Sequence, residues 1–322
     1  MVYNLFMKIL ILLGVAISVA LGRPSSDHYD GKTFRHPWGA NDAKGFLTVL
    51  RWKLTGSPER WPQSVPYAAR DLSPPPAKGA DVTWVNHSTF LIRFPGLTVL
   101  TDPIWSERAS PFSFLGPRRV HPPGIAFEQL PRIDVVVISH NEGRDRPLFL
   151  VPLGDKEWLL GKGLTRVVEK DWWEEEKIGD VDVTFTPAQH WSARTLWDRN
   201  ESLWGGWWIR QGETSLYHAG DTGLGPHFKM VRDRLGSPDV ALLPIGAYEP
   251  RWFMEANHMN PAEAVKAALQ LGASTNVAMH FGTFPLADEG HPRPPEDLNR
   301  ALLSHPELDF RVPQIGEGLA FE

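Results

Sequence analysis

Cysteine is absent from this 322-residue sequence. Its absence excludes disulfide frameworks, iron–sulfur clusters, thiolate metal sites and thiol nucleophiles. Any metal site in the protein must therefore use histidine, aspartate or glutamate side chains. The remaining composition, with 42% apolar and 22% charged residues, is typical of a globular protein.

A surplus of positive charge is also absent. The 33 Lys and Arg side chains stand against 38 Asp and Glu, and the formal net charge is −5. The chain therefore lacks the cationic field that holds nucleic acids through their phosphates. We expect no nucleic-acid partner.

The apolar run near the amino terminus is too short to span a membrane. Ile9–Leu21 has 13 residues, fewer than the roughly 18 to 20 that a spanning helix needs. Lys8 precedes the run, and Ala20 and Gly22 supply the small residues of a cleavage site. We predict that residues 1–22 form a signal peptide and that the protein is exported, periplasmic or membrane-associated. An uncleaved anchor is the alternative.

The next segment, residues 23–76, is polar and interrupted by proline and glycine, with one short helix expected over Ala43–Leu54. We predict that it is an arm wrapped over a main domain formed by residues 77–322. In that domain, short runs rich in Val, Ile, Phe and Thr predict strands. These runs are Val82–Val85, Thr89–Arg93, Leu97–Thr101, Val135–Ser139, Val181–Thr186, Trp207–Arg210, Ser215–His218, Val240–Pro244 and Asn276–Met279.

Two helices are predicted late in the chain. Asn260 can cap the first, Pro261 occupies its first position, Glu263 completes a capping box, and Gly272 ends it. The second is expected over Pro295–Ser304. Many strands with interspersed helices predict an α/β fold that is a layered sandwich and not a doubly wound parallel sheet.

Four predicted strands lead into an imidazole or a carboxylate. The four residues are His140, His190, Asp221 and His280, at spacings of 50, 31 and 59 residues. Ligands bind beyond the carboxyl ends of strands in α/β folds, and imidazoles with a carboxylate suit Zn or a similar divalent ion. One such histidine would be an ordinary surface or supporting residue. Four in corresponding positions predict a metal site.

The sequences around these four residues resemble the successive metal motifs of the metallo-β-lactamase superfamily. The motifs are Ile138–Asn141, Pro187–Ser192, Ala219–Gly223 and Met279–Phe284. The stretch Gly246–Met254, followed by His258, resembles the branch that contains N-acyl phosphatidylethanolamine-hydrolysing phospholipase D.

This resemblance implies a four-layer αβ/βα sandwich, with residues 77–322 as a metallo-β-lactamase-like hydrolase domain. It implies one or two Zn ions along one edge, with Mn or Fe as alternatives. Asp221 would bridge two ions, His140 and His190 would bind mainly one of them, and His280 would bind the other.

Two upstream segments, Asn86–Thr89 and Thr101–Ile104, are similar to the same branch. Within them, His87 and Asp102 are expected to lie behind the metal ligands and to hold them in orientation.

The loop after His140 departs from the family pattern His-x-His-x-Asp-His. Here His140 is followed by Asn-Glu-Gly-Arg-Asp-Arg-Pro, so three of the four loop ligands are missing, through a lost segment or an error in the gene sequence. In one interpretation Glu142 and Asp145 replace them as metal ligands. In the other they belong to a solvated turn, and the four strand-end residues remain for a single tetrahedral ion.

In an active site of this kind, the metal lowers the pKa of a bound water and polarises a phosphoryl or carbonyl oxygen. Asp221 would act in catalysis by fixing the metal and orienting the hydroxide. His258 is the second catalytic candidate, and its alternative role is a hydrogen bond ahead of the late helix.

Arg251 and Tyr248 are candidates for substrate binding, on the strength of the resemblance. A salt bridge from Arg251 to Glu249 or Glu255 is the structural alternative.

Tryptophan is abundant, with 14 Trp against 5 Tyr. The pairs Trp172-Trp173 and Trp207-Trp208, with Trp204, are candidates for a lipid-facing surface. The stretch Trp105–Phe127 mixes aromatic and basic residues as an interfacial loop does. Core packing is the alternative for these rings.

Three functions remain open. The first is a metal-dependent phosphodiesterase of the N-acyl phosphatidylethanolamine phospholipase D type, acting on a phospholipid with peripheral membrane contact. The second is an impaired member of the family with a degenerate metal site that binds a lipid or another partner. The third is a lactonase or other acyl hydrolase on the same scaffold, because a fold does not determine its chemistry.

Overall fold

The structure is a computed structural model that describes residues 26–39, 44–67, 72–110, 114–139, 147–195 and 197–321. The predicted signal peptide and the loop residues His140, Glu142 and Asp145 lie outside the described residues.

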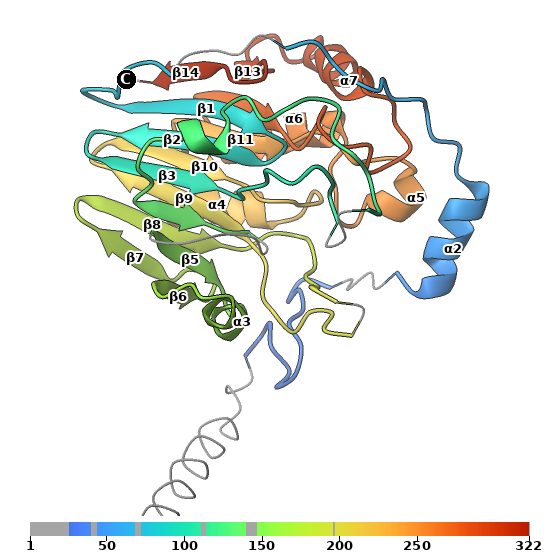
Figure 1. The fold of residues 1–322 in the computed structure, drawn as a ribbon, viewed down its shortest axis with the longest axis horizontal. Coiled ribbons are helices and arrows are strands. Elements are labelled where there is room, and N and C mark those ends of the chain that lie inside the picture. Colours follow the sequence, from blue (N-terminus) through green and yellow to red (C-terminus); the bar gives the residue numbers. More distant parts are fainter. Residues whose placement is uncertain are drawn as a thin grey trace, which may run out of the picture.

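Two seven-stranded sheets form the centre of the molecule (Figure 1). The first has the order β14-β1-β2-β3-β4-β5-β6 and the second the order β13-β12-β11-β10-β9-β8-β7. The strands of the first are β1 (Ala80–Asn86), β2 (Thr89–Phe94), β3 (Leu97–Thr101), β4 (Val135–Val137), β5 (Leu148–Pro152), β6 (Val167–Lys170) and β14 (Gly318–Phe321). Those of the second are β7 (Glu175–Ile178), β8 (Val181–Thr186), β9 (Gly206–Gln211), β10 (Thr214–His218), β11 (Val240–Pro244), β12 (Thr275–Met279) and β13 (Phe310–Arg311).

Each of the nine predicted strands overlaps an observed one, because runs of β-branched and aromatic residues fit a buried pleated surface. The prediction missed five strands. Four of them, β6, β7, β13 and β14, are the outer strands of the two sheets. In β6 and β7, charged residues such as Glu175 and Lys177 hide the apolar pattern, whereas β13 and β14 have only two and four residues, too few to show a clear pattern. The fifth, β5, is a short apolar run in the interior of its sheet.

The described helices are α2 (Phe46–Thr55), α3 (Lys156–Gly161), α4 (His227–Leu235), α5 (Arg251–Met254), α6 (Pro261–Leu271), α7 (Arg293–Leu302) and the 3₁₀ turn η1 (Phe127–Gln129). The predicted capping box of α6 is confirmed: the Asn260 side chain accepts from the Glu263 amide at 2.8 Å, and the Asn260 amide donates to the Glu263 carboxylate at 3.0 Å. Gly272 ends the helix in the left-handed conformation, at φ 68°. None of these helices combines the length and apolarity that crossing a membrane requires.

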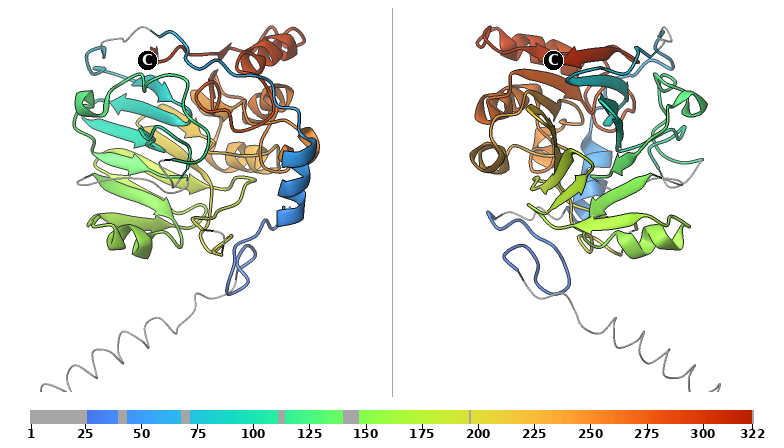
Figure 2. Two further views of the ribbon diagram at one scale, coloured as in Figure 1. Left: turned by 45° about the vertical axis from the view of Figure 1, so that its right-hand side comes forward. Right: turned by 90° about the vertical axis from the view of Figure 1, so that its left-hand side faces the viewer.

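The layers are those of a four-layer αβ/βα sandwich, which confirms the predicted fold class. Buried residues of both sheets form one continuous core between them, and a second cluster lies on the outer face of the first sheet. Helix α6 packs on β11 and α3 packs against β6. Figure 2, right, shows the orange and red helices on one side of the paired sheets and the green α3 on the other.

Strand direction determines where the site forms. Strands β10, β11 and β12 are parallel, and β8 runs the same way because both β8 and β10 are antiparallel to β9. The carboxyl ends of β8, β10 and β12 therefore share one edge of the sandwich. His190, Asp221 and His280 follow those three ends.

The amino-terminal segment contacts the main body at several places. The Phe34 amide donates to the Asn200 carbonyl at 2.8 Å, and the Val65 amide donates to the Val120 carbonyl at 2.7 Å. The helix expected over Ala43–Leu54 is α2. The boundaries of arm and domain stay a prediction.

The tryptophan clusters correct one prediction. Trp172, Trp204, Trp207 and Trp208 are all buried in the core, so they offer no surface to lipid and core packing is their role. Trp173 is partly buried and packs against the same core. In the Trp105–Phe127 stretch, by contrast, the side chains of Phe114, Leu115 and Phe127 are exposed.

Candidate metal centre

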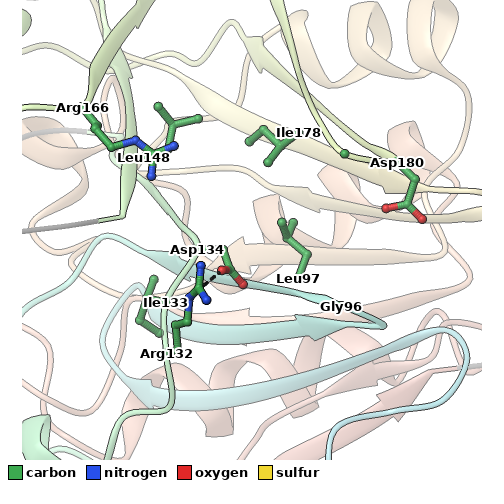
Figure 3. Close-up of a pocket in the computed structure, with 10 residues that line it drawn as sticks. Gly96, Leu97, Arg132, Ile133, Asp134, Leu148, Arg166, Ile178 and Asp180 are labelled. Atoms are coloured by element: carbon green, nitrogen blue, oxygen red, sulfur yellow. Dashed lines mark ion pairs between the residues drawn. The ribbon is translucent and has the colours of Figure 1, made fainter.

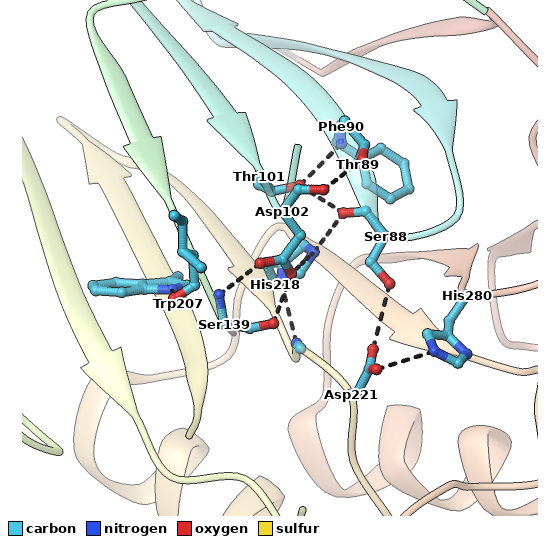
Figure 4. A network of polar contacts seen from close by, with 12 residues as sticks. Ser88, Thr89, Phe90, Thr101, Asp102, Ser139, Trp207, His218, Asp221 and His280 are labelled. Atoms are coloured by element: carbon cyan, nitrogen blue, oxygen red, sulfur yellow. Dashed lines mark hydrogen bonds and ion pairs between the residues drawn. The ribbon is translucent and has the colours of Figure 1, made fainter. Parts of the chain in front are cut away.

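A buried carboxylate and a buried imidazole meet at the edge where β10 and β12 end. Asp221 Oδ2 lies 3.0 Å from His280 Nε2, and both side chains are almost fully shielded from solvent. The Ser88 hydroxyl reaches the other carboxylate oxygen at 3.4 Å, as Figure 4 shows. Gly220 allows the chain to turn here at φ 64°, where a Cβ would lie 2.4 Å from the Gly205 carbonyl oxygen.

His87 contacts His280 through both backbone and ring, and its role behind a metal ligand stays a prediction. The His280 amide donates to the His87 carbonyl at 3.0 Å, and the two ring centroids lie 4.0 Å apart. Both residues have positive φ, 47° and 59°. The His87 amide is held in turn by the Thr283 hydroxyl at 3.0 Å.

The contact with Asp221 controls the protonation of His280. Burial lowers the pKa of this imidazole, but the charge of Asp221 and the hydrogen bond to it outweigh burial, so the pKa lies above its usual value. The pair therefore attracts positive charge, from a proton or from a metal cation.

His190 and His258 lie beside this pair. The His258 ring centroid is 5.1 Å from that of His190 and 5.2 Å from that of His280. His190 Nδ1 donates to the Trp191 carbonyl at 2.8 Å, which places the lone pair of the neutral ring on Nε2. Metal-binding histidines commonly have this arrangement. The structure thus brings together His190, Asp221, His258 and His280, four residues named from the sequence.

Asp102 holds the chain immediately before His140. One carboxylate oxygen accepts from the Ser139 amide at 2.6 Å and the other from the Ser139 hydroxyl at 2.8 Å (Figure 4). His218 completes this network by donating from Nε2 to the Ser88 carbonyl at 3.1 Å. Asp102 is thus positioned to orient the start of the loop that carries His140.

Arg251 and Tyr248 use their polar groups within the chain. Arg251 donates to the Glu263 carboxylate at 2.7 Å and to the His258 carbonyl at 3.0 Å. The structural alternative, a salt bridge from Arg251 to Glu249 or Glu255, is wrong, because the guanidinium pairs with Glu263 of α6. The Tyr248 hydroxyl donates to Asp297 at 2.6 Å, and burial together with this carboxylate raises its pKa. Substrate binding by these two side chains stays a prediction.

The sequence reasoning missed two histidines beside the centre. His36, in the amino-terminal segment, donates from Nε2 to the His190 carbonyl at 2.9 Å, and no pattern in that polar segment pointed to it. His227, at the start of α4, lies 3.1 Å from the hydroxyl of Thr222, which follows Asp221. Burial lowers the pKa of His36 to about 4 and that of His227 to about 3, so both rings are neutral at pH 7. The position of His227 just after the Ala219–Gly223 motif was the available signal.

The donor types present fit a divalent cation. Asp221 and His280 offer a carboxylate oxygen and an imidazole nitrogen at one buried point, and His190 and His258 add imidazoles nearby, which are the ligand types that Zn prefers. Within the described ranges, no three His, Asp or Glu side chains already form a complete metal-binding group. The described residues thus account for part of a donor set.

A cavity of about 680 Å³ lies at the opposite edge of the sandwich (Figure 3). Its lining comes from the segments where β3, β4, β5 and β8 begin, including Leu97, Asp134, Leu148 and Asp180. None of the predicted site residues that the structure describes is among its lining residues.

Comparison with known proteins places the chain among metal-dependent hydrolases. A family model described as "Beta-lactamase superfamily domain" matches residues 150–281. The chain is 36% identical over 249 residues to N-acyl-phosphatidylethanolamine-hydrolyzing phospholipase D 1 of Caenorhabditis elegans, covering 70% of each protein. It is 34% identical over 236 residues to the mitochondrial N-acyl-phosphatidylethanolamine-hydrolyzing phospholipase D of Saccharomyces cerevisiae, covering 67% of this chain and 50% of that protein.

Among solved structures, a metallo hydrolase from the hyperthermophilic archaeon Ignicoccus hospitalis is similar, with a TM-score of 0.58. The similarity covers 76% of this chain and 98% of that one at 23% identity, which is informative about the fold alone. The fold, the strand-end donors and the sequence relatives agree. The chain is a metal-dependent hydrolase and belongs to the metallo-β-lactamase superfamily.

Proposed function

We propose that this protein is a phosphodiesterase that hydrolyses the head-group phosphodiester of a phospholipid of the N-acyl phosphatidylethanolamine type. The observation that carries the proposal is the buried Asp221–His280 contact with His190 and His258 beside it. The 36% identity to a Caenorhabditis elegans enzyme named for that substrate supports the choice of substrate.

Asp221, His190 and His280 would hold the metal, together with His140 from the loop that follows Ser139. Glu142 and Asp145 stay candidate ligands. Zn is the metal we propose, as one or two ions, with Mn or Fe as other outcomes of a metal analysis. When bound, such an ion lowers the pKa of a coordinated water and withdraws charge from a phosphoryl oxygen.

The residues of this chain supply orientation and charge. Ser88 binds one carboxylate oxygen of Asp221, and His280 contacts the other. These two contacts fix the orientation of the carboxylate. The His258 ring lies beside those of His190 and His280, where its imidazole can exchange a proton with the attacking water or the leaving oxygen. Asp102 and His87 limit the motion of the ligand-bearing loops.

The proposal is tested by metal content and substrate profile of the purified full chain. We expect bound metal and release of phosphatidic acid and an N-acylethanolamine from N-acyl phosphatidylethanolamine. His190→Ala should abolish turnover, whereas His305→Ala, at a partly exposed histidine that pairs with Glu307, should leave it unchanged.

Other results would overturn the proposal in distinguishable ways. Hydrolysis of lactones with no turnover of the phosphodiester would identify an acyl hydrolase. Lipid binding by a preparation that holds no metal and takes none up would identify an impaired member of the family.

We also propose export of the protein through residues 1–22. Amino-terminal sequencing of the protein recovered from cells should begin near Arg23. A mature chain that begins at Met1 would favour the uncleaved anchor.

A further inference from the structure

Helix α2 turns most of its apolar side chains outward. Leu47, Leu50 and Leu54 are 76%, 41% and 75% exposed. At about 100° per residue these three positions span about 60° of the helix circumference. They therefore form one apolar stripe, which faces away from the rest of the protein.

The opposite side of α2 is anchored on the main body. Trp52 is buried, donates from Nε1 to Asp288 at 3.0 Å and packs on Phe253 of α5 with ring centroids 4.6 Å apart. Trp52 lies about 170° around the helix from the centre of the leucine stripe. The helix thus has a definite orientation, in which the stripe is its outer surface.

Positive charge is concentrated in the same segment, with Lys53 Nζ 3.8 Å from the Trp52 ring centroid and Lys44 Nζ 5.8 Å from that of Phe253. Residues 44–55 include Lys44, Arg51 and Lys53 and contain no acidic residue. Arg51 lies over the ring of Trp252 at 4.8 Å, and this indole is itself 41% exposed. Because the whole chain has a net charge of −5, this concentration of cations around apolar side chains is a local feature.

We propose that α2 docks the protein on an anionic phospholipid surface, with the leucine stripe at the boundary between head groups and acyl chains. Apolar residues flanked by cations are the chemistry that such a surface recognises, because lipid phosphates attract the cations while the leucines leave water. Exposed Trp252 extends the same surface, since indole rings favour the interface.

The position of α2 connects docking to the candidate metal centre. The helix lies beside α5 at the margin of the molecule (Figure 1), and α5 is followed by His258. Docking would bring this margin next to the membrane. That docking brings the candidate metal centre close to its substrate rests on the proposed phospholipid substrate. Docking itself is measured without turnover, so the docking proposal and the proposed function can fail separately.

The test is co-flotation of the full chain with vesicles of phosphatidylcholine and phosphatidylglycerol in equal parts. Changing Leu47, Leu50 and Leu54 to Ser should weaken binding roughly tenfold or more, since three apolar side chains lose their insertion. The matched control changes three exposed leucines elsewhere, Leu160, Leu269 and Leu303, to Ser and should bind like the wild type.

A second variant tests the charge and covers the case in which the leucine variant fails to fold. Arg51→Gln with Lys53→Gln should weaken binding by about fivefold for each cation removed. Lys177→Gln with Arg300→Gln, at exposed cations elsewhere, should have no effect. Added salt should weaken vesicle binding by the wild type and by this control, and should weaken binding less in the variant that lacks Arg51 and Lys53.

Two results would overturn the proposal. Wild-type binding by folded variants of α2 would assign the membrane contact to another segment, such as the apolar run Ile9–Leu21. If the leucine variant has a smaller oligomeric mass than the wild type in the absence of lipid, a second copy of the chain covers the stripe.

Discussion

Each of the two edges of the sandwich holds an aspartate paired with a basic side chain, but the two pairs lie in different surroundings. At the edge that holds the 680 Å³ cavity, Arg132 and Asp134 form an ion pair at 3.3 Å, but the Arg132 side chain is 91% exposed. At the other edge, the Asp221–His280 contact is buried. Water screens the first pair, whereas the second acts in a medium of low dielectric constant. The cavity and the buried donors therefore lie at different edges, and the candidate metal centre is defined by the donors.

The two edges also differ in backbone conformation, in the type of residue that has a positive φ. Around the candidate metal centre, His87, Asp102 and His280 all have positive φ, which costs free energy in residues with a side chain. At the cavity, the residues with positive φ are Gly96 and Gly179, which adopt it without strain. At the candidate metal centre, hydrogen bonds such as that from the His280 amide to the His87 carbonyl hold these conformations; Trp173, Asn200 and Ala247 also have positive φ.

The largest effect is expected from removing the buried carboxylate charge. Asp221→Asn should lower turnover by roughly 10²–10³-fold or more and reduce metal retention, because the amide no longer balances a cation. The matched variant Asp180→Asn, at the cavity edge, should keep both. Steady-state kinetics and metal analysis measure the difference, and equal losses would remove the distinction between the edges.

The next effect concerns orientation. Asp102→Asn should weaken metal affinity by roughly 10–100-fold, since a residue behind the ligands no longer holds Ser139 with a full charge. Asp81→Asn is the control, because Asp81 is a buried carboxylate paired with Arg93 at 2.7 Å. That variant should lose stability and keep its metal affinity in titrations. Unchanged affinity in Asp102→Asn would contradict the role of Asp102.

Acid should lower the stability of the folded protein through protonation of His227 in the unfolded state. The pKa of His227 is about 3 in the folded protein because the ring is buried, against about 6.5 when unfolded. As the pH falls below 6.5, the unfolded state gains a proton that the folded state refuses, so the free energy of unfolding decreases by about 1.4 kcal/mol per pH unit. At pH 5 this amounts to roughly 2 kcal/mol.

Denaturant titrations at pH 7 and pH 5 measure this effect. His227→Asn cannot take up the proton and should show a correspondingly smaller loss between the two pH values. An equal pH dependence in wild type and variant would assign the acid sensitivity to other groups.

The smallest effect is expected at the exposed ion pair. Arg132→Ala should change the free energy of unfolding by less than about 1 kcal/mol, since solvated ion pairs contribute little, and turnover should not change. A large loss of turnover would make the cavity edge a part of the site.

Contacts between residues close in sequence were predicted, whereas contacts between distant residues were not. The capping box of Asn260 and Glu263 predicted α6 because its contacts are local. The outer strands β6 and β7 were not predicted, because their charged residues obscure the alternation of apolar and polar side chains. The structural alternative for Arg251 was a salt bridge to Glu249 or Glu255, yet its guanidinium binds Glu263, twelve residues further along the chain. His36 contacts a carbonyl 154 residues away, a distance that no local pattern encodes.

The sequence by itself determined the types of donor and their places after strands, because side-chain chemistry and strand periodicity are local properties. Tertiary structure alone decided that Asp221 contacts His280, that His87 and Asp102 stand behind the ligands, and that the leucines of α2 face outward. Those outcomes depend on which strands run in parallel and on how the two sheets pack, and such long-range arrangements follow from the whole chain.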